Sequence, residues 1–148
     1  MSTVTGKKKV FVQGAISTHF IAESIQKHQN KMSIGAHDIF LGQVRADDKE
    51  KGIVQEIEYS AYEDMAESKI AEIREDTLNK YNLTCIHIYH SLGRVKVGDI
   101  CFFVFVSSKH RDNLNKALKE VVERVKSEVP IFGKEVLEGE EYVWKENR

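Results

Sequence analysis

The apolar run ICFFVFV at residues 100–106 constrains the fold more than any other stretch of the chain. It is too short to cross the hydrocarbon core of a bilayer, because a spanning helix needs about 20 residues. A short, continuous apolar run bounded by turn-forming residues is typical of a fully buried strand. We therefore predict a buried strand at residues 100–108.

The size and composition of the chain suit one globular domain. Its 148 residues can bury a proper core, and 41% of them are hydrophobic and 30% charged, as in ordinary soluble proteins. No repeat, low-complexity block or linker rich in proline, glycine or serine divides the sequence. We therefore treat residues 1–148 as a single domain.

Charge and targeting signals exclude several classes of protein. The formal net charge of -1 creates no global field that would attract nucleic acid or a membrane, so any anion site must be a local cluster. The N-terminal residues MSTVTGKKKV lack the apolar segment of a secretory signal. Two cysteines, Cys85 and Cys101, make neither a disulfide framework nor a zinc set. These features predict a reduced, cytoplasmic protein.

Strands and helices are mixed along the chain with short connections, which indicates an α+β fold. Periodicity predicts strands at 9–16, 35–45, 53–62, 83–92, 100–108 and 141–146. Helices are predicted at 17–29, at 62–81, and from Ser107 or Ser108 to Val129. The first should have Ser17 or Thr18 as N-cap, and the second should bury Met65, Ala66, Ile70, Ile73 and Tyr81. The intervening segments 46–52 and 93–99 are interpreted as a charged, mobile loop and a glycine turn.

The last helix ends at the only proline in the chain. Pro130 disfavours helical geometry in the preceding residue and cannot donate in the helical ladder, so the helix should stop near Val129. Lys126 lies about 100° from the centre of the apolar stripe, on the border between core and solvent. There its amine could be partly desolvated and serve as acid, base or nucleophile. The alternative is a lysine whose stem packs while its amine stays in water.

A basic cluster, SSKHRD at 107–112, coincides with the predicted start of this helix. The free N–H groups of a helix N-terminus favour anions, and His110 and Arg111 would strengthen a phosphate site there. The alternative is a solvated basic turn. Arg45 follows FLGQV at a predicted strand end and is a third candidate, although a surface ion pair would also explain it. Taken alone, these residues support an anion pocket built from His110, Arg111, Lys126 and Arg45.

The sequence shows no sign of a metal site. The six histidines have no metal-ligand spacing, and His87 and His90 should face opposite sides of a strand. Cys85 and Cys101 lie in apolar strands, where buried, inert thiols are the simplest interpretation. We therefore expect no metal and no cofactor.

Five separated motifs, in order, resemble one family. FLGQVR (40–45), EYSAYEDMA (58–66), GRVKVGD (93–99), VSSKHR (106–111) and KSEVPIFGKE (126–135) follow the order and spacing of the catalytic large subunit of molybdopterin synthase. The resemblance extends from about Val10 to Trp144. It implies an α/β hammerhead-like fold, an α+β domain with an additional antiparallel β subdomain.

The resemblance also implies a reaction and an assembly. Two large subunits form a homodimer, and two small ubiquitin-like subunits complete a heterotetramer. The small subunit carries a C-terminal Gly-Gly thiocarboxylate and donates its sulfur to cyclic pyranopterin monophosphate. Two such transfers form the dithiolene of molybdopterin, a step of molybdenum cofactor biosynthesis. The chain is thus expected to be a cytoplasmic sulfurtransferase that binds neither nucleic acid nor membrane.

Site residues follow from the matched motifs. The resemblance implies Lys126 and Lys134 as catalytic residues, and these two with seven others as substrate-binding residues: Gln43, Val44, Arg45, His110, Arg111, Gly133 and Glu135. Lys126 matches the essential lysine, whose role could be acid–base, electrostatic or covalent. The family pattern PIWKKE reads PIFGKE here, so Phe132 replaces a tryptophan and Gly133 replaces the first lysine. Lys134 could take the place of that lysine only if Gly133 allows the backbone to follow a different path that brings Lys134 to the pocket.

Two other functions remain open from the residues. A non-catalytic scaffold that only binds a ubiquitin-like tail is suggested by the altered lysine pair. A general phosphometabolite-binding domain is the best that the residues support without the resemblance. A scaffold would bind the small subunit without forming product, whereas the enzyme forms product. A phosphometabolite-binding domain would not prefer the pterin to simple nucleotides, whereas the enzyme would.

Overall fold

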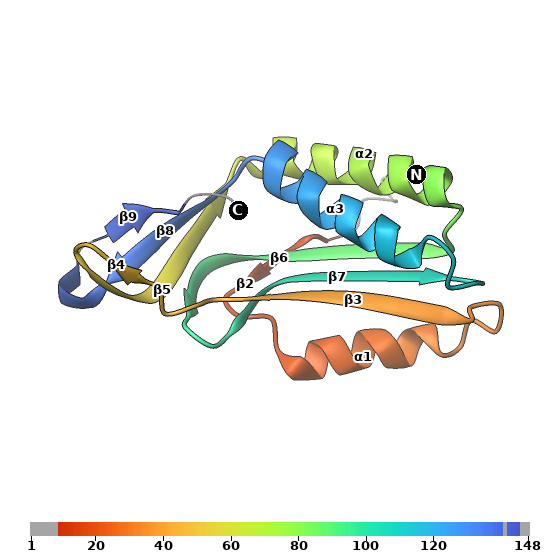
Figure 1. Cartoon of the computed structure of the whole chain (residues 1–148), viewed down its shortest axis with the longest axis horizontal. Coiled ribbons are helices and arrows are strands. Elements are labelled where there is room, and N and C mark those ends of the chain that lie inside the picture. The colour runs from red at the N-terminus through yellow and green to blue at the C-terminus, as the bar shows by residue number, and fades with distance from the viewer. Residues whose placement is uncertain (1–8, 141, 146–148) are drawn as a thin grey trace.

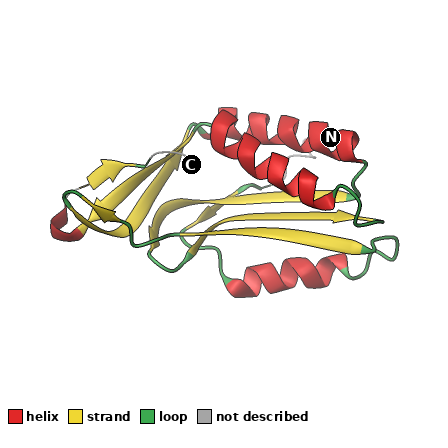
Figure 2. Cartoon of the chain, in the orientation of Figure 1, coloured by secondary structure: helices red, strands yellow, loops and turns green. Residues whose placement is uncertain are grey.

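The computed structural model of the protein describes residues 9–140 and 142–145. Its strands are β2 (Phe11–Gln13), β3 (Ala36–Gln43), β4 (Asp48–Lys49), β5 (Gly52–Ala61), β6 (Cys85–Lys96), β7 (Ile100–Ser108), β8 (Ile131–Leu137) and β9 (Tyr142–Trp144). Its helices are α1 (Thr18–His28), α2 (Glu63–Tyr81) and α3 (Leu114–Glu128), with a short 3-10 turn, η1 (Glu138–Glu140). The strands join in one sheet of order β3-β7-β6-β5-β8-β9, with β2 beside β6 and β4 beside β5. The predicted α+β class is confirmed (Figure 2).

Helices cover both faces of the main part of the sheet. Helix α1 packs on one face, and α2 and α3 lie side by side on the other (Figure 1). Side chains of strand β7 pack into the cores on both faces of the sheet, because successive side chains of a strand point to opposite faces. Phe103 and Phe105 join the core beneath α1, whereas Phe102, Val104 and Val106 join the larger core beneath α2 and α3. The predicted buried strand is confirmed, since residues 101–108 are all buried.

Strand β6 connects two parts of the molecule. Its residues 85–90 pair with β7, and its residues 93–96 pair with β5. Strands β5, β8 and β9 then form an antiparallel subdomain that extends beyond the helices (Figure 1). The implied additional antiparallel β subdomain is present.

Three expectations about strands need correction. Residues 93–96 are not a turn but the end of β6, and the turn comes at 97–99. The segment 46–52 is not simply a loop, because β4 within it pairs with β5. Strand β8 was not predicted, because its sequence IFGKEVL contains a glycine and two adjacent charges and does not alternate. Its strand geometry comes from pairing with β5.

The start of α3 also differs from the prediction. Residues Ser107 and Ser108 still belong to β7, and the helix begins at Leu114 after Asn113, which has a left-handed backbone with φ 65°. The strand ends where the Ser108 hydroxyl and the backbone of His110 hydrogen-bond to each other. The basic cluster therefore forms a loop, and it does not occupy the first turn of a helix. The loop backbone at Lys109 passes close to Gly35, where only glycine fits, because a Cβ on Gly35 would lie 2.3 Å from the carbonyl oxygen of Lys109.

The helix ends otherwise follow the sequence. The Ser17 hydroxyl accepts a hydrogen bond of 3.0 Å from the Phe20 N–H, which confirms an N-cap at the start of α1. The last helix has Val129 in extended geometry at its C-cap, directly before Pro130, as predicted. Met65 was placed wrongly on the buried face of α2, because its side chain is 65% exposed. None of the described helices combines the length and the apolar character needed to cross a membrane.

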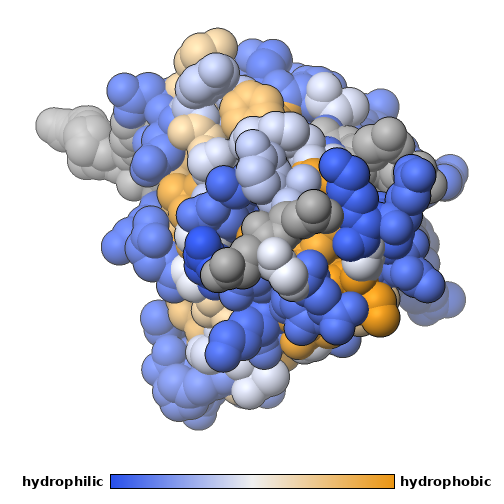
Figure 3. All heavy atoms as spheres, turned by 90° about the vertical axis from the view of Figure 1, so that its left-hand side faces the viewer, coloured by the Kyte–Doolittle hydropathy of each residue, from blue (hydrophilic) through white to orange (hydrophobic). Residues whose placement is uncertain are grey.

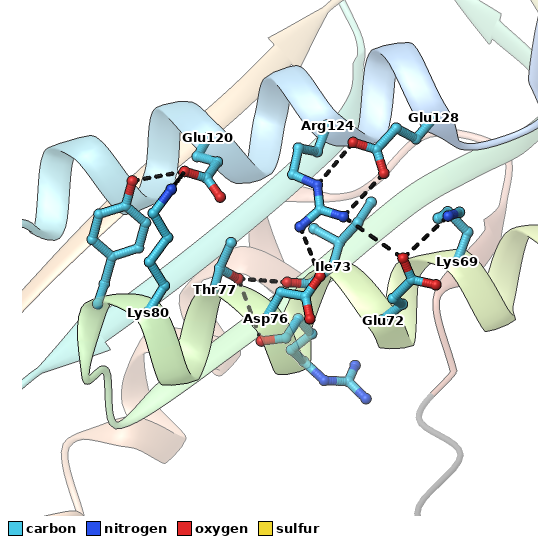
Figure 4. A network of polar contacts seen from close by, with 11 residues as sticks. Lys69, Glu72, Ile73, Asp76, Thr77, Lys80, Glu120, Arg124 and Glu128 are labelled. Atoms are coloured by element: carbon cyan, nitrogen blue, oxygen red, sulfur yellow. Dashed lines mark hydrogen bonds and ion pairs between the residues drawn. The ribbon is translucent and has the colours of Figure 1, made fainter.

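A network of charges fixes α3 against α2. The Arg124 guanidinium donates two hydrogen bonds to Glu128, at 2.8 and 3.0 Å, and one to Asp76 on α2 at 3.1 Å. Its Nη2 also lies 3.8 Å from an oxygen of Glu72 on α2, so one arginine joins three carboxylates (Figure 4). Lys80 of α2 donates to Glu120 of α3 over 2.8 Å. Because Lys126 follows Arg124 by two residues, this network helps to fix the end of α3 that carries Lys126.

Candidate functional site

A pocket of about 650 Å³ opens where the helical part of the molecule meets the antiparallel subdomain. Its wall comes from the end of β3 and the residues after it, from β5 and β6, from the start of β7, and from the last turn of α3. Strands β8 and β9 and the residue after β9 close the remaining side. Six of the predicted site residues line it: Gln43, Val44, Arg45, Lys126, Gly133 and Glu135.

Lys126 is the cation on the helical wall of this pocket. Its neighbour Val125 is buried and anchors the last turn of α3 in the core, as a border position requires. The ammonium Nζ lies 5.9 Å from the centre of the Phe40 ring. Burial, followed by the positive charges of Lys145 and Arg45, lowers the pKa of Lys126. A lowered pKa lets this amine exchange a proton nearer neutral pH than an ordinary lysine.

The floor of the pocket is neutral. The Tyr59 hydroxyl donates to Cys101 Sγ over 3.4 Å, and burial raises the pKa values of both groups. His90 Nδ1 lies 2.8 Å from the carbonyl oxygen of Ser91, which only accepts, so Nδ1 carries the proton. Burial, helped by the charge of Lys126, lowers the pKa of His90 to about 4. Tyr59, Cys101 and His90 are therefore uncharged near pH 7.

The segment after β3 presents its residues through a β-bulge. The pairing register of β3 with β7 shifts between Gly42 and Gln43, and such shifts redirect side chains next to sites. Val44 is buried, and its N–H donates to the Asp99 carbonyl over 3.0 Å, so it contributes backbone and packing. The Arg45 side chain is 70% exposed and pairs with Asp47 at 3.3 Å. Arg45 thus lies at the rim of the pocket and forms a surface ion pair, which was the alternative interpretation from the sequence.

Strand alternation divides the residues of β8 between two faces. Gly133 and Glu135 face the pocket. The Glu135 carboxylate is buried and lies 3.5 Å from the Lys49 ammonium. Lys134 does not line the pocket, because its Nζ lies 3.3 Å from Glu58 on the opposite face and 4.7 Å from the centre of the Tyr142 ring. The expected substitution by Lys134 therefore does not occur in this backbone.

Lys145 occupies the place beside Gly133 instead. Its N–H donates to the Gly133 carbonyl over 2.8 Å, and a Cβ on Gly133 would lie 3.5 Å from the Lys145 Cβ. Lys145 lines the pocket and contributes to the lowered pKa of Lys126. Sequence reasoning missed this residue, because only the pairing of β8 with β9 brings it to Gly133. It also missed His90, Tyr59 and Cys101 as pocket residues.

His110 and Arg111 lie away from the pocket of their own chain. The Arg111 carbonyl accepts from the Leu114 N–H at the start of α3. From Leu114 to Lys126 the helix axis rises about 18 Å, at about 1.5 Å per residue. Both residues are exposed. One chain therefore brings Arg45 close enough to Lys126 to influence its pKa, but it leaves His110 and Arg111 at the other end of α3.

The end of the molecule formed by the antiparallel subdomain exposes large hydrophobic side chains. Tyr142 is 54%, Trp144 is 61% and Phe132 is 40% exposed. Figure 3 shows hydrophobic patches between hydrophilic residues on this end. A second hollow of about 380 Å³ lies beside the pocket and shares Lys126, Gly133, Trp144 and Lys145 with it.

The chain resembles known proteins over most of its length. It matches the family model described as MoaE protein over residues 15–128. It is 35% identical over 130 residues to the molybdopterin synthase catalytic subunit of Staphylococcus carnosus (strain TM300), covering 83% of this chain and 85% of that protein. It is 39% identical over 105 residues to the corresponding subunit of Staphylococcus aureus (strain N315), covering 70% of each.

Solved structures show the same fold. The crystal structure of molybdopterin synthase from Staphylococcus aureus matches with a TM-score of 0.79 and 32% identity, over 93% of this chain and 96% of that chain. A complex of subunits 1 and 2 of molybdopterin-converting factor from Helicobacter pylori matches with a TM-score of 0.79 and 22% identity, over 94% and 90% of the two chains.

Proposed function

The chain belongs to the MoaE family of molybdopterin synthase catalytic subunits, the sulfurtransferases of molybdenum cofactor biosynthesis, and we propose how its pocket carries out the transfer. The pocket receives the C-terminal Gly-Gly thiocarboxylate of a small ubiquitin-like subunit. Its sulfur passes to cyclic pyranopterin monophosphate in the cytoplasm, and two transfers build the dithiolene. The observation that carries this proposal is Lys126, a lysine of lowered pKa on the pocket wall.

The cations of the pocket suit its substrates. Lys126, Lys145 and Arg45 converge there, and a thiocarboxylate and a phosphate are both anions. As the sulfur bonds to a carbon of the pterin in place of an oxygen substituent, water attacks the carbonyl carbon of the partner's tail. The bond between that carbon and the sulfur breaks, the tail leaves as a carboxylate, and negative charge develops on the carbonyl oxygen. In this proposal Lys126 stabilises that charge and exchanges the proton, because its lowered pKa fits it for proton transfer. The neutral thiol of Cys101 supplies no sulfur, since the partner brings it.

Lys145 performs the role expected of the lysine that Gly133 replaces. Its backbone is tied to Gly133, and its charge acts on Lys126. Gln43, the backbone of Val44, Gly133 and Glu135 then form the substrate-binding wall. Lys134 is left as a surface residue paired with Glu58. This assignment favours catalysis over the scaffold hypothesis, because Lys145 still places a second lysine near Lys126 in the pocket.

A second copy of the chain supplies His110 and Arg111 in this proposal. They lie at the opposite end of α3 from Lys126 within one chain, so a homodimer is the simplest way to bring them to a substrate phosphate. The small subunit docks at the antiparallel subdomain, where exposed aromatic side chains surround the hollow beside the pocket. The solved complex of two subunits from Helicobacter pylori supports such an assembly.

Reconstitution tests this function. The purified chain is mixed with a thiocarboxylated small subunit and cyclic pyranopterin monophosphate, and the product is identified by mass spectrometry. We expect molybdopterin to form, and calorimetry to show binding of the pterin in preference to simple nucleotides. Binding of the small subunit without any product would support the scaffold hypothesis instead. Equal binding of nucleotides would favour a general phosphometabolite-binding domain.

A further inference from the structure

A second group of chemically reactive side chains lies on the other face of the sheet, beneath α1. His28 is the last residue of α1, and Cys85 and His87 are alternate residues at the start of β6. Alternate residues of a strand share one face, so both β6 side chains point to the same side. One ligand atom from each of the three residues lies within 4.8 Å of the other two.

His28 has the arrangement of a metal-binding histidine. Its side chain is buried, with 7% exposed. Its Nδ1 lies 2.7 Å from the Ser24 carbonyl oxygen, which can only accept, so Nδ1 carries the proton. The lone pair is therefore on Nε2, which is buried without a hydrogen-bond partner. Metal-bound histidines usually donate their other ring N–H to a carbonyl or carboxylate in this way, and a buried nitrogen without a partner is otherwise costly.

The other two side chains complete a compact set. Cys85 is buried, and its Sγ accepts a hydrogen bond of 3.0 Å from the Lys31 ammonium. The His87 ring lies 4.6 Å from the His28 ring, centre to centre, in an edge-to-face arrangement. The same side of the sheet carries Phe105, which packs against the His28 ring at 4.6 Å. One sulfur and two imidazoles thus converge beside the Phe105 ring.

We propose that His28, Cys85 and His87 bind one divalent ion of the zinc class, with water as a fourth ligand. One thiolate and two imidazoles are a ligand set that suits zinc. On binding, the Cys85 thiol releases its proton to solvent, and both imidazoles remain neutral. Zinc bonds of about 2.0–2.3 Å place tetrahedral ligands about 3.5 Å apart. The three ligand atoms, which lie within 4.8 Å of one another, therefore need to approach by about 1 Å when the ion binds.

The site is distinct from the catalytic pocket. His90 lies three residues after His87 on β6 and faces the pocket, so the sheet separates the two sites. A metal here would tie the C-terminal end of α1 to β6 and stabilise that contact. Residue spacing did not indicate it, because His28 and Cys85 meet only when α1 packs on the sheet.

Cobalt titration tests the proposal on the full chain. Co²⁺ added to the metal-free protein should bind in one equivalent, with a near-ultraviolet thiolate-to-cobalt absorption and visible bands of a tetrahedral site. Cys85→Ser should abolish the thiolate absorption, and His28→Gln should weaken binding at least about tenfold. The controls Cys101→Ser and His19→Gln, a buried cysteine and an exposed histidine outside the set, should bind like the wild type.

Thermal unfolding gives a second measurement. Zn²⁺ should raise the unfolding temperature of the wild type and raise that of His28→Gln by clearly less at the same Zn²⁺ concentration. Circular dichroism of each metal-free variant checks that it is folded. No saturable cobalt signal in the wild type would overturn the proposal. So would a thiolate absorption that persists in Cys85→Ser or disappears in Cys101→Ser.

Discussion

The backbone N–H of Lys145 donates a 2.8 Å hydrogen bond to the carbonyl of Gly133, and this contact brings a second lysine to the pocket that Lys126 lines. The family pattern PIWKKE, which this chain resembles, has a lysine where the chain has Gly133. Here the cation comes from the residue after β9, across the β8–β9 pairing. In our proposal, Lys145 thus supplies from a different part of the chain the cation that the family pattern has at position 133.

Removing the Lys145 amine should slow sulfur transfer and change its pH dependence. Lys145→Ala is expected to lose about tenfold in rate, since one cation near the developing charge is removed. Its positive charge helps to lower the pKa of Lys126, so the pKa of Lys126 should rise in the variant. The pH–rate profile measures both effects. A larger loss in Lys134→Ala than in Lys145→Ala would contradict the assignment.

Mixed dimers test whether His110 and Arg111 act across the proposed homodimer. Lys126→Ala and Arg111→Ala chains are each expected to be nearly inactive alone. In a mixed dimer, one site has both mutations and the other has neither if Arg111 comes from the second copy. Equal mixing should then recover about a quarter of wild-type activity, since half of the dimers have one intact site of two. No recovery after confirmed chain exchange would show that both residues act within one chain.

Acid should destabilise the fold through His90. The pKa of His90 is about 4 in the folded chain, against 6.5 for an ordinary histidine. Between these values the unfolded chain binds a proton that the folded chain does not, so stability is present above pH 6.5 and falls toward pH 4. The full loss in the free energy of unfolding is about 3 kcal/mol.

Urea unfolding at pH 7.5 and pH 4.5 measures this effect. The free energy of unfolding of His90→Gln should depend less on pH than that of the wild type, because the variant lacks the titrating imidazole. Parallel pH dependence of the two proteins would show that His90 does not contribute.

Arg124 should stabilise the pairing of α2 with α3. Arg124→Ala is expected to lower the free energy of unfolding by about 1 kcal/mol, because three carboxylates lose their shared partner. Arg124→Lys should retain only part of this stabilisation, since a lysine ammonium cannot bind a carboxylate through two parallel N–H groups as a guanidinium does. High salt should reduce the difference. Lys119→Ala, an exposed lysine on the same helix, is the control, and an equal effect of both alanine variants would contradict the network.

Much of this structure was predictable from local pattern. The buried run at 100–106 and the proline stop after α3 depend on a few neighbouring residues, and both were predicted. Strand β8 and the end of β6 were not, because their pairing with β5 compensates for glycines and charges within them. The basic cluster at 107–112 was misplaced because residues 109–113 form a loop between β7 and α3, so the helix begins only at Leu114.

The site was predicted only in part for the same reason. Gln43, Val44, Arg45, Lys126, Gly133 and Glu135 came from motifs and do meet at one pocket. Lys145 and His90 reach it through strand pairing that no short motif encodes. Lys134 was expected at the site from its sequence neighbours, but strand alternation places it on the other face.

The most direct test of the account is single-turnover sulfur transfer by Lys126→Ala. The variant is mixed with excess thiocarboxylated small subunit and limiting cyclic pyranopterin monophosphate, beside the wild type and the control Lys119→Ala. We predict that Lys126→Ala binds the small subunit and unfolds like the wild type but loses at least about 100-fold in rate, while Lys119→Ala retains full activity. Near-normal turnover by Lys126→Ala would contradict the central role of this lysine.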